Sequence, residues 1–169
     1  MIVVFEGLSC VGKTSLIDYL ARLSDCMVVK EWADCLDQMS ESIERKCYLN
    51  DVYKTAALRD SSSLTLVDRY YPSTLACRYS ESMLDVDDYL AQVDCSEYVE
   101  PDGWVYVQEA VVQSIARSAK YRKDDSSPWF DHDKARKIVQ FYDAFFAGKA
   151  NVIRLNSSSL HGFIMDNCQ

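Results

Sequence analysis

Glycine and proline are scarce in this chain, with 5 glycines and 3 prolines among 169 residues. This excludes a collagen-like or low-complexity chain, and a hydrophobic content of 49% is too high for a disordered one. No apolar run approaches the ~20 residues of a membrane span. The four apolar residues 2–5 are too few for a signal peptide and lack its basic start. We therefore expect an ordered protein with no export signal and no membrane segment.

Metal-binding patterns are also missing. The 7 cysteines are odd in number and include no Cys-x-x-Cys pair, and neither of the 2 histidines lies at metal-ligand spacing from one. We interpret the cysteines as reduced thiols, which is typical of a cytoplasmic protein.

Basic residues are the minority charge, 18 against 26 acidic ones, for a net charge of −8. Attraction to a nucleic-acid polymer or to an anionic membrane is therefore excluded as the main activity. Any anion that the protein binds must be held by local contacts. The length suits a single domain over residues 1–169.

Short apolar runs alternate with longer segments of helical spacing. The pattern predicts strands at 2–6, 27–30, 64–67, 103–107 and 152–155, and helices at 13–23, 40–58, from about 72, 86–93, 111–119 and 131–146. Strands that alternate with helices predict an α/β fold of three layers, with a five-stranded parallel sheet flanked by helices.

Residues 7–14, Gly-Leu-Ser-Cys-Val-Gly-Lys-Thr, fit the phosphate-loop (P-loop) pattern between a strand and a helix. The glycines let backbone N–H groups point at phosphate oxygens, Lys13 adds a positive charge, and the Thr14 hydroxyl can bind Mg²⁺. The alternative is a turn that binds nothing. The predicted ATP-binding residues are Gly7, Ser9, Cys10, Val11, Gly12, Lys13, Thr14 and Ser15.

The sequence also limits the reaction. A GTPase would need an Asn-Lys-x-Asp stretch and an Asp-x-x-Gly sensor, and neither occurs here. Mechanical ATPases need a longer chain. A phosphotransferase that moves the γ-phosphoryl group of ATP to a small acceptor remains.

Asp68 and Arg69 follow the third apolar run. In an open α/β sheet, ligands bind at the carboxyl ends of the strands, so both residues are expected beside the phosphate loop. The carboxylate can hold the hydration shell of the metal, and the guanidinium can clamp a phosphate. A structural ion pair at a helix start is the alternative.

These motifs together resemble a known family. The phosphate loop after Val-Phe-Glu, the stretch Asp-Arg-Tyr at 68–70 with Ser73 and Ala76, and Pro-Asp before the run 104–107 resemble the thymidylate kinase branch of the P-loop nucleoside and nucleotide kinases. The resemblance implies the P-loop NTPase fold, ATP with Mg²⁺, and a small acceptor that is a nucleotide or a nucleoside. It also implies a homodimer, formed through the helices after the second and third strands.

The resemblance assigns roles by position. Lys13 and Thr14 would handle the ATP phosphates and the metal, and Asp68 the metal and the acceptor. Arg69 would bind the acceptor phosphate, as would Arg59, whose match is weaker because it lies close to Asp68. Two departures, Ser9 in place of an acid and a missing glutamine for base recognition, argue against thymidylate as the acceptor.

Glu31 follows the second expected strand and precedes Trp32. In the related deoxynucleoside kinases, an acid at this place accepts the proton of the nucleoside hydroxyl. A hydroxyl acceptor needs such a base, whereas a phosphate acceptor needs cations. Glu31 favours the first and Arg59 with Arg69 the second; a solvated loop acid remains an alternative. Trp32 and Tyr70 are candidates for contact with the acceptor, although an aromatic residue at a strand end is more often core.

A basic cluster at residues 117–123 precedes a Pro-terminated polar segment. The resemblance makes residues 117–130 a lid that closes over ATP, in which Arg117 and Arg122 contact the transferring group. A solvated basic helix end is the alternative.

The sequence thus predicts an ATP-dependent kinase of a nucleoside monophosphate. Catalysis is assigned to Lys13, Glu31, Asp68, Arg69, Arg117 and Arg122, and the metal to Thr14 and Asp68. A kinase of a nucleoside or other hydroxyl metabolite, with Glu31 as base, is the second hypothesis. An ATP-binding protein that has lost its activity is the third.

Overall fold

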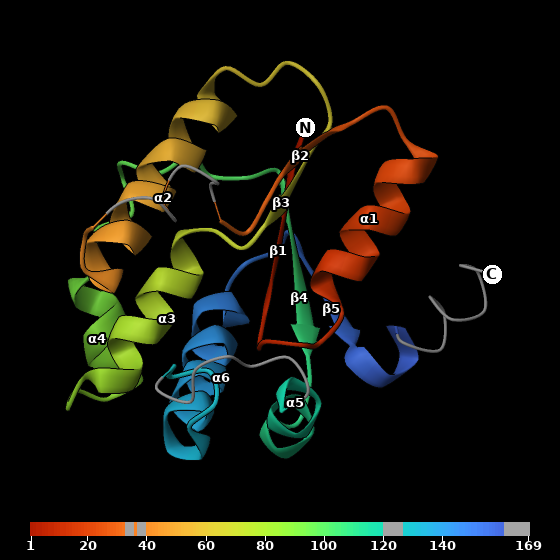
Figure 1. Ribbon diagram of the computed structural model, residues 1–169. Helices are drawn as coiled ribbons and strands as arrows, with labels where there is room; N and C mark the ends of the chain where they lie inside the picture. Colours follow the sequence, from red (N-terminus) through yellow and green to blue (C-terminus); the bar gives the residue numbers. More distant parts are fainter. Residues whose placement is uncertain (33–35, 37–39, 120–126, 161–169) are drawn as a thin grey trace.

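The computed structural model describes residues 1–32, 36, 40–119 and 127–160. Its strands and helices alternate along the chain as the sequence predicts (Figure 1). In chain order they are β1 (Ile2–Gly7), α1 (Lys13–Leu23), β2 (Met27–Val29), α2 (Ile43–Arg59), β3 (Thr65–Asp68), α3 (Tyr71–Glu81), α4 (Val86–Gln92), β4 (Gly103–Gln108), α5 (Val111–Ser118), α6 (His132–Ala147) and β5 (Val152–Asn156).

The five strands form one sheet in the order β2-β3-β1-β4-β5, and every pair is parallel. The predicted α/β class with a five-stranded parallel sheet is therefore confirmed. The register pairs Phe5 with Asp68 and Gly7 with Val107. As a result, the carboxyl ends of β1, β3 and β4 meet at one edge of the sheet.

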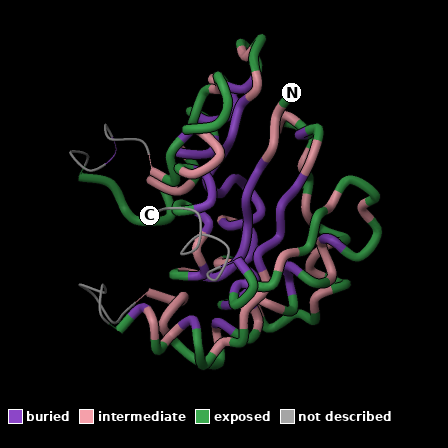
Figure 2. Tube along the Cα trace, turned by 90° about the vertical axis from the view of Figure 1, so that its right-hand side faces the viewer, coloured by how far each residue is buried: buried purple, intermediate pink, exposed green. Residues whose placement is uncertain are grey.

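Helices cover both faces of the sheet. Figure 1 shows α1 on one side and α2, α3 and α6 on the other. The buried residues run through the central strands, with exposed residues on the outer helices (Figure 2). The apolar face of α6 supplies Ile138, Phe141, Tyr142 and Phe146, all fully or almost fully buried. This core fixes the strands whose ends carry the candidate site.

Local signals explain the helix starts. The helix predicted from residue 40 begins at Ile43, because the Ser42 side chain caps it by accepting a hydrogen bond from the Arg45 N–H. Asp131 caps α6 in the same way, through the N–H groups of Asp133 and Lys134. Among the described residues, no helix is both long and apolar enough to cross a bilayer.

Candidate functional site

The loop between β1 and α1 turns sharply at its glycines. Gly7 and Gly12 have φ values of 139° and 99°, a region that other residues rarely adopt. A Cβ atom on Gly7 would lie 2.3 Å from the carbonyl oxygen of Val107 in β4, so only glycine fits there. Gly12 is the N-cap of α1, and the first N–H groups of that helix are therefore directed toward the loop. Such a loop forms an anion cradle.

Lys13 is the first residue of α1 and is buried. Its Nζ donates hydrogen bonds to the carbonyl oxygens of Leu8, at 2.8 Å, and Gly7, at 3.3 Å. Burial, together with the positive charge of Arg69, lowers the pKa of Lys13 to about 8. The ammonium group thus lies across the loop, where bound phosphates would compensate its charge.

Thr14 and Asp68 meet across the sheet edge. The Thr14 hydroxyl donates a hydrogen bond of 2.5 Å to Oδ2 of Asp68. The other carboxylate oxygen, Oδ1, is buried and has no hydrogen-bond partner within the described residues. A hydroxyl and a carboxylate are ligands that suit Mg²⁺, which keeps several waters and completes its shell with substrate phosphates. These two residues therefore fit the expected metal.

Arg69 is the centre of the site and is buried. Its Nε lies 2.7 Å from Oε1 of Glu31, and its outer nitrogens donate to the hydroxyls of Ser73 and Ser9 at 3.2 and 3.3 Å. Burial opposes the charge of Arg69, but Glu31, Tyr142, Glu6 and Asp68 together outweigh it and raise the pKa of the guanidinium. The guanidinium therefore links the phosphate loop to the end of β2.

Glu31 lies two residues after the end of β2, and its side chain is half-exposed. Burial works against its charge, but Arg69, Lys13 and Lys54 together hold the pKa of this carboxyl below its usual value of 4.5. Glu31 is therefore ionised at neutral pH. A carboxylate in this state can accept a proton from a bound acceptor.

Three site residues were missed by the sequence reasoning. Glu6 is fully buried and accepts hydrogen bonds from the Tyr70 N–H and from the hydroxyls of Ser73 and Tyr142. Burial raises the pKa of this carboxyl, despite the charge of Arg69. Lys54 of α2 donates to the backbone beside Arg69.

Trp129 is the third missed residue, and its ring lies 4.1 Å from the Arg69 guanidinium carbon. A charged residue in the middle of a helix and a tryptophan outside any motif carry no signal for such contacts.

Two predicted substrate residues, Tyr70 and Arg59, contact other parts of the protein. Tyr70 is buried, with its hydroxyl 2.6 Å from that of Thr55 and accepting the Val99 N–H, so it supports the core beside the site. Arg59 ends α2 and donates to the carbonyl oxygen of Glu97. Asn50, in the same helix, donates to the carbonyl oxygen of Glu31. Nine residues of helix correspond to roughly 13 Å, so Arg59 is well removed from Glu31.

The predicted lid is described only at its two ends. Arg117 pairs with Glu109 at 2.8 Å and donates to the hydroxyl of Ser157. Ser157 in turn donates to the carbonyl oxygen of Val11, which connects Arg117 to the phosphate loop. Arg122 lies outside the described residues. Cys10 and Ser15 are exposed on the loop and at the start of α1.

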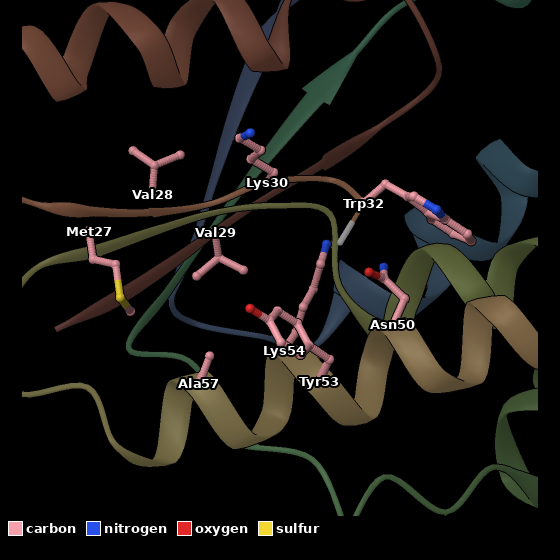
Figure 3. A pocket seen from close by; sticks show the side chains of 9 residues that line it. All are labelled: Met27, Val28, Val29, Lys30, Trp32, Asn50, Tyr53, Lys54 and Ala57. Carbon is pink, nitrogen blue, oxygen red and sulfur yellow. The ribbon is translucent and has the colours of Figure 1, made fainter. Parts of the chain in front are cut away.

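A cavity of about 260 Å³ lies between β2 and α2 (Figure 3). Trp32 and the aliphatic stem of Lys54 border it, and the Lys54 ammonium points away from α2 toward the strand ends. Trp32 thus lies next to Glu31, at the rim of this cavity. The remaining lining residues are Met27, Val28, Val29, Lys30, Asn50, Tyr53 and Ala57.

Solved structures share this architecture over almost the whole chain. Deoxyadenosine kinase from M. mycoides, with the products dCMP and a flexible dCDP bound, matches with a TM-score of 0.65 and 14% identity, covering 99% of this chain and 98% of that one. The same enzyme with bound dATP matches with a TM-score of 0.66 and 12% identity, covering 99% of both chains. The chain has the fold of the P-loop nucleoside and nucleotide kinases.

Thymidylate kinase from Candida albicans matches with a TM-score of 0.63 and 14% identity, covering 99% of this chain and 92% of that one. No protein-family model and no curated protein sequence matches. The P-loop kinase fold is therefore established by structure, at identities too low to transfer a substrate.

Proposed function

We propose that the protein is a kinase that transfers the γ-phosphoryl group of ATP to the hydroxyl group of a nucleoside. The observation that carries this proposal is the ionised Glu31. Its carboxylate lies 2.7 Å from Arg69, at the edge of the sheet next to the phosphate loop. Deoxynucleoside kinase structures are among those with this fold. In this reaction the acceptor oxygen bonds to the γ-phosphorus, the bond to ADP breaks, and Glu31 takes the hydroxyl proton.

The other site residues act on the phosphates. Backbone N–H groups of the loop and the Lys13 ammonium bind the β- and γ-phosphates, and Arg69 offers N–H groups toward the transferring group. Thr14 and Asp68 would hold Mg²⁺. When bound, the metal would neutralise the negative charge of the phosphates.

A nucleoside monophosphate, which the sequence favours, is the second candidate acceptor. Arg69 supports it, because the hydroxyls of Ser9 and Ser73 that now occupy its outer nitrogens could be replaced by phosphate oxygens. Against it, Glu31 already neutralises Arg69, and Arg59 is roughly 13 Å further along α2 than Asn50. An anionic acceptor would therefore approach the Glu31 carboxylate without help from Arg59.

The test is to offer deoxynucleosides and their monophosphates to the protein with MgATP, and to identify the products by mass. We expect transfer to nucleosides, and a fall in kcat of about 100-fold or more in Glu31→Gln, which is typical for loss of a general base. Glu41→Gln, which changes an exposed acid ahead of α2, is the matched control. Transfer to monophosphates that Glu31→Gln leaves intact would establish the second candidate. ATP binding without any transfer would instead establish a protein that has lost its activity.

A further inference from the structure

Asp68 is the last residue of β3, and Arg69 follows it directly. The pairing of β3 with β2 stops before both residues. β2 pairs with β3 only as far as Val67, through Val29. Beyond that point, no described residue on the β2 side forms a strand pair with Asp68 or Arg69. A buried carbonyl without a partner destabilises the fold, so some other group must supply hydrogen bonds there.

Lys54 supplies them from α2. Its Nζ donates to the carbonyl oxygens of Asp68 and Arg69, both at 2.8 Å, and the whole residue is 1% exposed. Figure 3 shows the side chain rising from the helix toward the ends of the strands. A buried ammonium group is costly unless it is paired, and here two carbonyl dipoles are its partners.

The backbone at this point is strained. Arg69 has a φ of 59°, in the left-handed region that a residue with a long side chain rarely adopts. Such a conformation is unfavourable and persists only where the surrounding structure holds it. On the β1 side, the carbonyl of Phe5 accepts from the Arg69 N–H, and Glu6 accepts from the Tyr70 N–H. The N–H groups are thus held from β1 and the carbonyls from α2.

The side chains on this strained turn are those of the proposed reaction. Asp68 extends to Thr14, and Arg69 extends to Glu31 and Ser9. A relaxed φ at Arg69 would rotate the guanidinium away from Glu31. Lys54 instead donates to the backbone carbonyl groups of these two residues and so acts on the turn itself.

We infer that Lys54 is a positioning residue of the active site, which holds the Asp68–Arg69 turn in the conformation that aligns the metal-binding carboxylate and the guanidinium. This inference deepens the proposed function and rests on it. Lys54 acts through the side chains of Asp68 and Arg69 and not on the reacting atoms themselves. The ATP phosphates are held by the loop and by Lys13, so loss of Lys54 should slow transfer more than it weakens the binding of ATP.

The kinetic test compares Lys54→Met, which keeps the length but has no donor, with Lys54→Gln, which keeps amide donors. Lys46→Met, a half-buried lysine two turns earlier in α2, is the matched control. We expect kcat to fall about 30-fold or more in Lys54→Met and less in Lys54→Gln, with the KM for MgATP changed less than about threefold, as for an interaction made in the transition state. Lys46→Met should match the wild type. An unchanged kcat in folded Lys54→Met would overturn the inference, as would equal losses in kcat and in ATP affinity.

A second measurement does not depend on activity. Because Trp129 lies over the Arg69 guanidinium, a ¹⁹F label on the tryptophans reports where Arg69 is. Trp129→Phe assigns the resonance, and Arg69→Met shows the effect of losing the guanidinium. We expect Lys54→Met to shift the Trp129 resonance toward its position in Arg69→Met, and to leave that of Trp104 in place.

The two readouts separate the two claims. If the wild type transfers phosphate to neither class of acceptor, the proposed function is wrong, and the Trp129 resonance then decides the role of Lys54 alone. If the wild type is active while Lys54→Met changes neither kcat nor that resonance, the proposed kinase activity is supported and the positioning role of Lys54 is wrong. Lys54→Gln keeps the test decisive should Lys54→Met not fold.

Discussion

Cations gather within the site, although the protein as a whole carries −8. The cations Lys13, Lys54 and Arg69 and the acids Glu31 and Asp68 all interact across the carboxyl edge of the sheet. Burial lowers the pKa of both lysines to about 8. Without bound phosphates, Lys13 therefore begins to lose its charge close to neutral pH.

This state of Lys13 predicts a proton uptake when ATP binds. At pH 8 the free protein carries a proton on about half of its Lys13 side chains, and phosphates beside the ammonium would raise the pKa and draw in the missing half. Titration calorimetry in buffers of different ionisation enthalpy should show uptake of about half a proton at pH 8, and about a tenth at pH 7. Heats independent of the buffer at pH 8 would show that the phosphates do not approach Lys13.

At the scale of elements, the site depends on how closely strands and loop approach. Gly7 ends β1 where the backbone turns into the phosphate loop, against the Val107 carbonyl of β4. Gly148, which follows α6, has open space around its Cβ position and a φ of −98°. The two glycines differ in what a methyl group would meet, so they form a matched pair.

We predict that Gly7→Ala lowers the free energy of unfolding by about 3 kcal/mol or more. A Cβ atom 2.3 Å from a backbone oxygen forces the strands apart, and a φ of 139° adds strain for any other residue. Gly148→Ala should change stability by no more than about 0.5 kcal/mol. Urea unfolding of the two variants, followed by circular dichroism, makes the comparison. Equal stabilities would show that β1 and β4 can separate at no cost.

The elements themselves could be predicted from the sequence, with bounds that differ by a few residues. The phosphate loop was predictable because its chemistry is local: glycines, Lys13 and Thr14 are contiguous in the chain. Asp68 and Arg69 were predictable because the ends of parallel strands meet at one edge. Lys54 and Trp129 were not, because their roles depend on which groups β2 leaves unpaired and on where the fold places the Trp129 ring.

Arg59 illustrates the opposite case. Its sequence context suggested a phosphate contact, but helical geometry places it two and a half turns beyond Asn50, the residue that reaches Glu31. Whether a helical side chain reaches a site depends on the angle and depth at which the helix packs. Neither quantity is written in the local sequence.

At the scale of the whole molecule, one core joins all the elements that carry the site. Trp104 in β4 is fully buried, and the rings of Phe145 and Phe146 of α6 pack against it. Tyr142 of the same helix reaches Glu6 at the end of β1. Loss of any one layer would therefore expose both the core and the site, which favours unfolding in a single step.

We predict that residues 1–169 unfold as one cooperative unit that MgATP stabilises as a whole. In a Trp32→Phe/Trp129→Phe variant, the fluorescence of Trp104 reports the core alone, while far-ultraviolet circular dichroism reports all helices. The two urea transitions should coincide, and MgATP at about 100 times its Kd should add about 2.7 kcal/mol to the free energy of unfolding without changing the slope. Lys13→Ala should lose most of that increment and keep the coincidence. A helical transition that precedes the Trp104 transition would instead show that some of the helices unfold separately from the central sheet.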